Sequence, residues 1–146
     1  MAEMTIESQR FGKFQAQEDQ IFHFDGLPGF ADAKRFVLLR HDRESPFEWM
    51  ICVDDPELGF VVTDPRQFFP SYPDRPRPEL HQAVGQKPES PIDLLAIVQL
   101  REGEPTLNLM APVVLAPETR RGAQVILEGN DHALRTPLPT PKPEEG

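Results

Sequence analysis

The seventeen prolines of this 146-residue chain limit its fold more than any other feature. Proline lacks a backbone N–H and breaks both helix interiors and central strands, so ordered elements have to be short and lie between prolines. Seven prolines fall within residues 64–91, too many for a continuous strand or helix there. Four more lie in residues 137–146, which are almost free of apolar residues, and we expect an extended, mobile tail in that segment.

Between the prolines, short apolar runs alternate with turn signals. The run 36–39 is apolar on both faces, which indicates a strand that is covered on both sides. Residues 47–53 and 59–63 flank a turn at 54–57 and form the clearest hairpin. The full set of expected strands is 5–7, 11–14, 21–24, 34–40, 47–53, 59–63, 92–100, 107–111, 113–115 and 124–127.

One segment, 78–85, fits a short helix, because a proline stands in its first turn and a glycine at its end. Many short strands joined by turns favour a sandwich or a barrel. The sequence therefore predicts an all-β protein, a small, partly closed β-barrel-like fold with one short helix. We expect this domain to take residues 1–136 and a flexible, proline-rich tail to take 137–146.

The charge balance bears on possible partners. Fifteen Lys and Arg stand against twenty-four Asp and Glu, which gives a net charge of -9. Nucleic-acid binders usually carry a basic stripe, and the pairs Lys34-Arg35 and Arg120-Arg121 are too short and scattered to form one. We therefore expect no direct binding of nucleic acid. The acidity either serves a basic protein partner or only keeps the protein soluble, and both interpretations stay open.

Redox chemistry and membrane insertion have little support in the sequence. The only cysteine, Cys52, lies in an apolar run and resembles a small buried hydrophobe. The first residues lack the features of a secretory signal, and no apolar stretch approaches the ~20 residues that span a bilayer. We expect a cytoplasmic protein that does not associate with membranes.

The best candidate for catalytic chemistry is a group of carboxylates, Asp54, Asp55, Glu57 and Asp64. Neighbouring carboxylates can act as acid and base or bind a divalent cation, so an alternative function is a metal-dependent hydrolase that uses Asp54, Asp55 and Asp64. However, Asp-Asp-Pro-Glu is also a favoured turn sequence. The four histidines show no metal-ligand spacing. We expect no enzymatic activity, no metal and no cofactor.

A proline-rich loop that holds three aromatic residues, Phe68, Phe69 and Tyr72, is the other unusual feature. Loops run over the surface, where exposed aromatics mark interaction patches. The alternative is that the two phenylalanines fix the loop to the domain, which would still leave Tyr72 at the surface. The candidate partner-binding residues are Asp54, Asp55, Asp64, Phe68, Phe69 and Tyr72.

Taken together, the residues in several of these segments resemble the FliW family over Met4–Leu138. The specific parts are the Val-Asp-Asp-Pro stretch at 53–56 and the Asn-Leu-x-Ala-Pro stretch at 108–112. The other matching segments are 24–30, 36–39, 47–65, 69–72, 107–114 and 122–127.

This resemblance implies a non-enzymatic flagellar assembly factor with a small β-barrel-like fold. It implies two protein partners: CsrA, an RNA-binding translational repressor, and flagellin. Binding to CsrA would relieve repression of flagellin synthesis, and flagellin would compete for the same factor. The segment 86–91 is shorter and richer in proline than the family pattern, and Ile51-Cys52 replaces a more polar pair.

Overall fold

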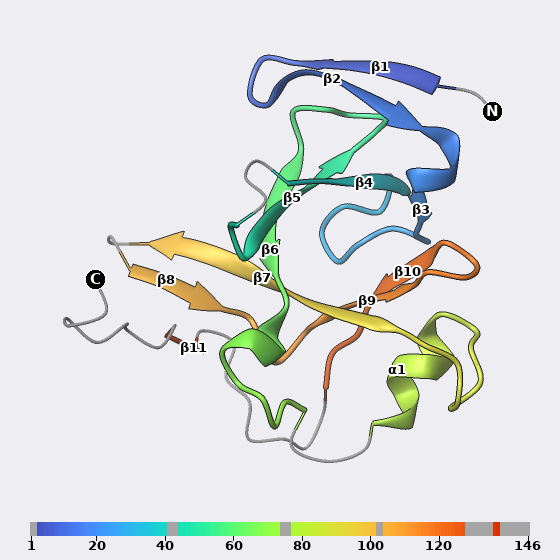
Figure 1. The fold of residues 1–146 in the computed structure, drawn as a ribbon, viewed down its shortest axis with the longest axis vertical. Coiled ribbons are helices and arrows are strands. Elements are labelled where there is room, and N and C mark those ends of the chain that lie inside the picture. Colours follow the sequence, from blue (N-terminus) through green and yellow to red (C-terminus); the bar gives the residue numbers. More distant parts are fainter. Residues whose placement is uncertain (1–2, 41–43, 74–76, 102–103, 128–135, 138–146) are drawn as a thin grey trace.

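The computed structural model describes residues 3–40, 44–73, 77–101, 104–127 and 136–137 (Figure 1). Short strands make up most of it, as the spacing of the prolines predicts. In chain order the elements are β1 (Glu3–Ser8), β2 (Gly12–Gln17), η1 (Glu18–Gln20), β3 (Phe22–His23), β4 (Arg35–Leu39), β5 (Phe47–Cys52), β6 (Gly59–Thr63), η2 (Pro65–Gln67), α1 (Pro78–Ala83), β7 (Asp93–Arg101), β8 (Glu104–Leu107), β9 (Val113–Ala116), β10 (Arg121–Gln124) and β11 (Thr136–Pro137).

Seven strands close into a barrel. Their order is β7-β6-β5-β4-β3-β10-β9, and β9 pairs back with β7. The closure depends on the length of β7: Asp93 to Leu95 pair with β9, whereas Val98 to Arg101 pair with β8 outside the ring. The all-β prediction is confirmed, and the barrel is closed rather than only partly closed. All pairings in the ring are antiparallel except one, the parallel contact between β3 and β10 at His23 and Arg121.

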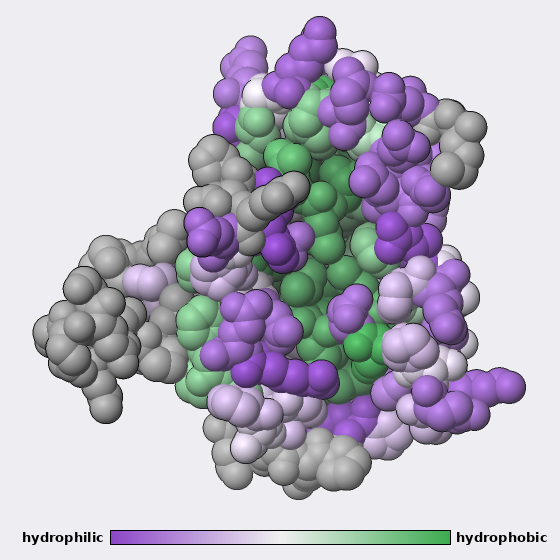
Figure 2. Space-filling view, viewed as in Figure 1, coloured by the Kyte–Doolittle hydropathy of each residue, from purple (hydrophilic) through white to green (hydrophobic). Residues whose placement is uncertain are grey.

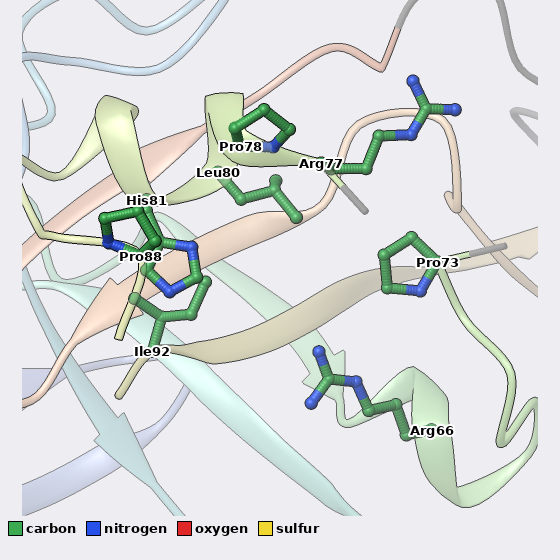
Figure 3. Close-up of a pocket in the computed structure, with 8 residues that line it drawn as sticks. All are labelled: Arg66, Pro73, Arg77, Pro78, Leu80, His81, Pro88 and Ile92. Carbon is green, nitrogen blue, oxygen red and sulfur yellow. The ribbon is translucent and has the colours of Figure 1, made fainter. Parts of the chain in front are cut away.

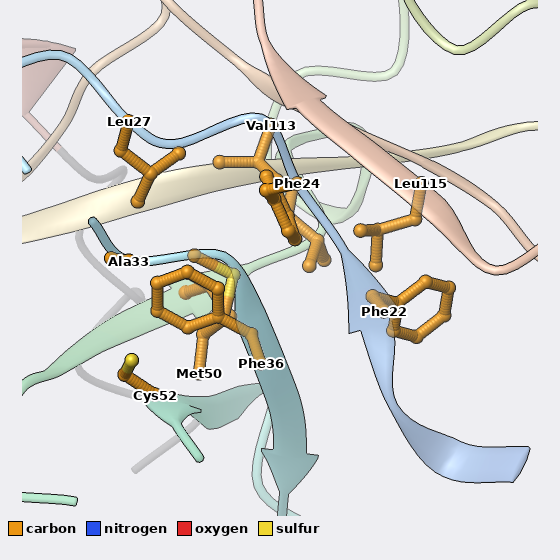
Figure 4. Packing of buried hydrophobic residues seen from close by; sticks show 11 residues of the cluster. Phe22, Phe24, Leu27, Ala33, Phe36, Met50, Cys52, Val113 and Leu115 are labelled. Carbon is orange, nitrogen blue, oxygen red and sulfur yellow. The ribbon is translucent and has the colours of Figure 1, made fainter. Parts of the chain in front are cut away.

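Large apolar side chains fill the barrel interior (Figure 4). They come from alternate positions of the strands, because successive side chains of a strand point to opposite faces. Phe24 and Phe36 meet nearly edge to face with their ring centroids 5.1 Å apart. The cluster consists of Phe22, Phe24, Leu27, Ala33, Phe36, Met50, Cys52, Val62, Leu95, Val113 and Leu115. Cys52 is thus a buried core residue, as its apolar neighbours in sequence predict.

The outer face of the barrel is covered in two places, which Figure 1 shows at opposite ends of the molecule. The β1–β2 hairpin packs on Val37 and Ile51 through Ile6 and Ala16. Helix α1 and the proline-rich loop before it cover the outer face of β7 and β9. Phe36 therefore points into the barrel while Val37 lies under the hairpin, which confirms that this strand is covered on both sides.

Of the ten predicted strands only 59–63 has the predicted bounds, and the two largest differences have a local cause. The run 107–111 leaves the sheet after Leu107, because the side-chain oxygen of Asn108 accepts the amide of Ala111 at 3.1 Å and closes a turn. Residues 125–127 lie beyond β10, although their backbone still bonds to the segment 110–112. The two short 3-10 turns were not predicted.

At the carboxyl end, Thr136 and Pro137 pair with β8 as strand β11. The rest of the predicted tail, 138–146, lies outside the described residues, so its flexibility stays a prediction. None of the helices in the described residues is long and apolar enough to span a membrane.

Candidate functional site

The three carboxylates proposed for a hydrolase do not come together. Asp54 and Asp55 precede β6, whereas Asp64 follows it, and a five-residue strand separates its two ends by ~17 Å. Within the described residues, no group of three His, Cys, Asp or Glu side chains lies close enough to hold a metal ion. The metal-hydrolase alternative is therefore wrong about its site, because the strand between the carboxylates places them at opposite ends.

Of the four carboxylates at positions 54, 55, 57 and 64, all except that of Asp55 form a hydrogen bond or an ion pair within the described part of the fold. Asp54 forms an ion pair with Arg35 of β4, whose Nε lies 3.2 Å from both carboxylate oxygens. The Arg35 guanidinium holds the pKa of the Asp54 carboxyl below its usual range by this hydrogen bond, although burial acts in the opposite direction. Asp64 caps η2 and accepts the amide of Arg66 at 2.9 Å.

Glu57 connects two hairpins that are far apart in sequence. Its carboxylate accepts the backbone amides of Gln9 at 2.8 Å and of Arg10 at 3.1 Å, together with the Ser8 hydroxyl at 3.3 Å. The turn of the β5–β6 hairpin thereby holds the turn of the β1–β2 hairpin. The remaining carboxylate, that of Asp55, is exposed and has no ion pair among the described residues.

Asp55 lies in a hollow of about 420 Å³ that we call the acidic pocket. The loop between β3 and β4 adds Asp32, which is also exposed and not ion-paired within the described chain. Sequence reasoning missed Asp32, because only the folded loop brings it to the 54–57 turn. Phe30, Asp32, Asp54 and Asp55 are among the residues that line the pocket.

The aromatic loop is largely part of the core. The Tyr72 side chain is 4% exposed, and its hydroxyl donates to the carbonyl of Leu109 at 2.7 Å. Burial raises the pKa of the Tyr72 phenol well above its ordinary value. Phe68 stacks on Phe47, and both it and Phe69 are half-buried against the cluster under α1. The expectation that Tyr72 lies at the surface is wrong, because the loop folds its ring inward. Contact of the loop with a partner stays a prediction.

A second hollow, of about 670 Å³, lies between this loop and α1 (Figure 3). Three cationic or titratable side chains line it, but each contacts the protein itself. Arg77 lies 3.6 Å from Glu79 and extends away from His81 in Figure 3. His81 contacts the carbonyl of Ser90 at 3.1 Å, and the Nε of Arg66 donates to the backbone of the loop at 3.2 Å. We assign no ligand to this hollow.

A third hollow, which we call the groove, is apolar and has a volume of about 450 Å³. Phe30 and Ile126, the two large hydrophobic side chains that the described residues leave most exposed, at 43% and 58%, both line it. Figure 2 shows hydrophobic surface in the middle of the face seen in Figure 1, bordered by hydrophilic residues. Phe30 belongs to both the groove and the acidic pocket, so the two hollows are neighbours.

Comparisons with known proteins agree with this fold over nearly its whole length. The family model described as FliW protein matches residues 5–138. The flagellar assembly factor FliW 2 of Desulfotalea psychrophila is 36% identical, with 97% of this chain and 95% of the relative covered. The FliW of Carboxydothermus hydrogenoformans is also 36% identical, with 97% and 94% covered. A crystal structure of the flagellar assembly factor FliW superposes with a TM-score of 0.83 at 30% identity, with 94% of this chain and 98% of that one covered.

Proposed function

This chain belongs to the FliW family of flagellar assembly factors, and from this premise we propose that it is a non-enzymatic antagonist of the translational repressor CsrA that also binds flagellin. Through these two partners it would couple the synthesis of flagellin to its assembly. The observation that carries the proposal is the match to the family over 5–138, which leaves no part of the barrel unmatched. The relatives are named as assembly factors and not as enzymes.

The acidic pocket supports a basic partner. Asp32 and Asp55 are exposed there, and no lysine or arginine lines the pocket within the described residues. A chain with net charge -9 also attracts a basic protein at long range. We propose that the acidic pocket docks beside the basic RNA-binding surface of CsrA and disfavours RNA by its negative potential. A regulator that meets a translational repressor would act in the cytoplasm.

Capture of both partners tests the function. The full chain is immobilised, and purified CsrA is applied, followed by flagellin. We expect CsrA to be retained and then released when flagellin is added. Retention of neither protein would overturn the proposal.

Variants of the acidic pocket test the place of CsrA binding separately. An Asp32→Asn/Asp55→Asn variant removes two charges without a change of shape, and Glu89→Gln/Glu118→Gln removes two exposed charges outside the pocket. We expect the pocket variant to weaken CsrA binding more than the control, and we expect higher salt to reduce the difference. Equal binding by both variants would place CsrA elsewhere on the surface.

A further inference from the structure

The groove is preorganised around Phe30. The phenylalanine closes a turn in the loop between β3 and β4, where Leu27 and Phe30 exchange backbone hydrogen bonds of 3.0 and 2.7 Å across Pro28 and Gly29. Gly26 permits this loop, since its φ of 107° and the Ala31 carbonyl 2.6 Å from an added Cβ exclude a larger residue. The Phe30 ring then rests edge to face on Phe60, with the ring centroids 5.7 Å apart. A binding surface made of such a fixed ring loses little side-chain freedom when it is covered.

The floor of the groove continues into the barrel core. Phe60 contacts Phe36 of the interior cluster at 6.3 Å between ring centroids. Leu27 is buried, and Ile97 of β7 lies half-buried against the same cluster. Because Phe60 and Leu27 pack on the core, the Phe30 ring is held at the surface of the groove, and Ile126 is exposed in the same hollow. Ile126 comes from the segment after β10, so the barrel has to close before the groove exists.

The polar side chains of the groove are mostly occupied by the fold. Asn108 accepts the amide of Ala111, and Gln124 donates to the carbonyl of the same residue, each at 3.1 Å. The exception is Gln99, whose buried side-chain oxygen has no hydrogen-bond donor among the described residues. A buried acceptor without a donor is costly, and this oxygen is itself shielded from the surface of the groove.

The charges beside the groove define the occupant further. Within the described part of the chain, neither the groove nor the acidic pocket next to it is lined by lysine or arginine. Asp32 and Asp55 of the acidic pocket are exposed and carry no ion pair. A second copy of this chain is a poor occupant, because two molecules of net charge -9 would place their acidic pockets close together.

We propose that the groove binds an amphipathic segment of a protein partner, in which apolar side chains cover Phe30 and Ile126 and an adjacent Lys or Arg meets the acidic pocket. This inference rests on the proposed function. Of the two proposed partners, it assigns the groove to flagellin, because the free subunit of a polymer exposes apolar surface that assembly later buries. An occupant that covers Phe30 also covers one wall of the acidic pocket, so the two hollows cannot be filled independently.

The test is a titration of the full chain and its Ile126→Ser variant with purified flagellin and with CsrA. Ile126 lines the groove but not the acidic pocket, and its exposure makes the substitution harmless to folding, which thermal unfolding verifies. Gln67→Ser, at an exposed position of η2 that lines neither hollow, is the control. We expect Ile126→Ser to weaken flagellin binding by about tenfold or more and to leave CsrA binding unchanged.

The outcomes separate the inference from the function it rests on. If the unsubstituted chain binds neither partner, the proposed function fails, and the inference fails with it. If Ile126→Ser binds flagellin as tightly as the unsubstituted chain, or if it loses CsrA, the inference alone is overturned. A dimer of the unsubstituted chain that Ile126→Ser dissociates would instead assign the groove to a second copy.

Competition by two synthetic peptides tests the chemistry of the occupant. Both peptides carry the same apolar run, flanked by Lys in one and by Glu in the other. We expect the Lys-flanked peptide to displace flagellin at a lower concentration. Equal displacement, or none by either peptide, would contradict the amphipathic, basic segment.

Discussion

The hydroxyl of Tyr72 donates a 2.7 Å hydrogen bond to the backbone carbonyl of Leu109, thirty-seven residues later in the chain. The bond joins the proline-rich loop to the segment that follows β8, and it lies in the buried cluster under α1. The bond adds to the packing of Phe68 and Phe69 in fixing this loop to the barrel. Its contribution can be measured directly.

Tyr72→Phe should destabilise the fold. The substitution keeps the ring but removes the donor, so the Leu109 carbonyl loses its partner in a buried place, which costs about 1–2 kcal/mol. Urea denaturation measures the change, and Ser71→Ala, at an exposed position of the same loop, is the control. Equal stabilities of the two variants would contradict the role of the bond.

Alkaline pH should weaken the fold through the same residue. Burial raises the pKa of the Tyr72 phenol in the folded state, so the unfolded chain releases this proton near pH ~10 while the folded chain retains it. Stability therefore falls as pH rises past about 10, by up to ~1.4 kcal/mol per pH unit. Denaturation at several pH values should show a steeper fall for the unsubstituted chain than for Tyr72→Phe, and parallel curves would refute the assignment.

The Arg35–Asp54 ion pair should show the opposite pH dependence. The pKa of Asp54 is lowered in the folded state, so its contribution is present above the unfolded value near ~4 and is lost as pH falls through the folded one. Both side chains are partly exposed, and we expect Asp54→Asn to cost only ~0.2–1 kcal/mol near neutral pH. This cost should disappear in acid, and Asp55→Asn should have none at either pH.

Glu57 should protect the turn of the first hairpin. Glu57→Ala removes the acceptor of the Gln9 amide and one of the two acceptors of the Arg10 amide. We expect both amides to exchange with solvent faster, that of Gln9 about tenfold or more, since a hydrogen bond to a charged group contributes ~1.5 kcal/mol or more. Hydrogen exchange followed by NMR measures this rate. Glu7→Ala, at an exposed position of β1, should leave both rates unchanged.

Gly122 should tolerate no side chain. A Cβ at this position of β10 would lie 2.4 to 2.9 Å from the Phe24 ring in the barrel interior, so Gly122→Ala should cost about 1–3 kcal/mol by overpacking. Phe24→Leu frees part of this space, and the double variant should be more stable than the sum of the two single effects predicts. Additive effects in denaturation would show that the interior relaxes in another way.

Local sequence patterns predicted a strand well where its burial follows from the alternation of residues within that strand. In β5 the first three residues are half-buried and the last three are buried, as expected for a strand whose polar end lies at the edge of the core. Helix α1 also lies where Pro78 and Gly85 place it. These features depend on short-range alternation and on the backbone limits of proline and glycine, which are visible in a single sequence.

The surface hollows depend on contacts that no local pattern reveals. Asp54, Asp55 and Asp64 are near each other in sequence, yet β6 places them at its two ends. Phe30 and Ile126 are far apart in sequence, yet closure of the barrel brings both to one groove. A sequence predicts which residues are acidic or apolar, whereas the register and closure of the sheet decide which of them meet.

Closure of the seven-strand ring also limits how another molecule can bind to this protein. Every strand of the ring has a neighbour on both sides, so no strand of the ring is an edge strand along its whole length. A partner that binds the barrel therefore finds mostly side chains on its surface, and side-chain contacts can be released without unfolding either molecule.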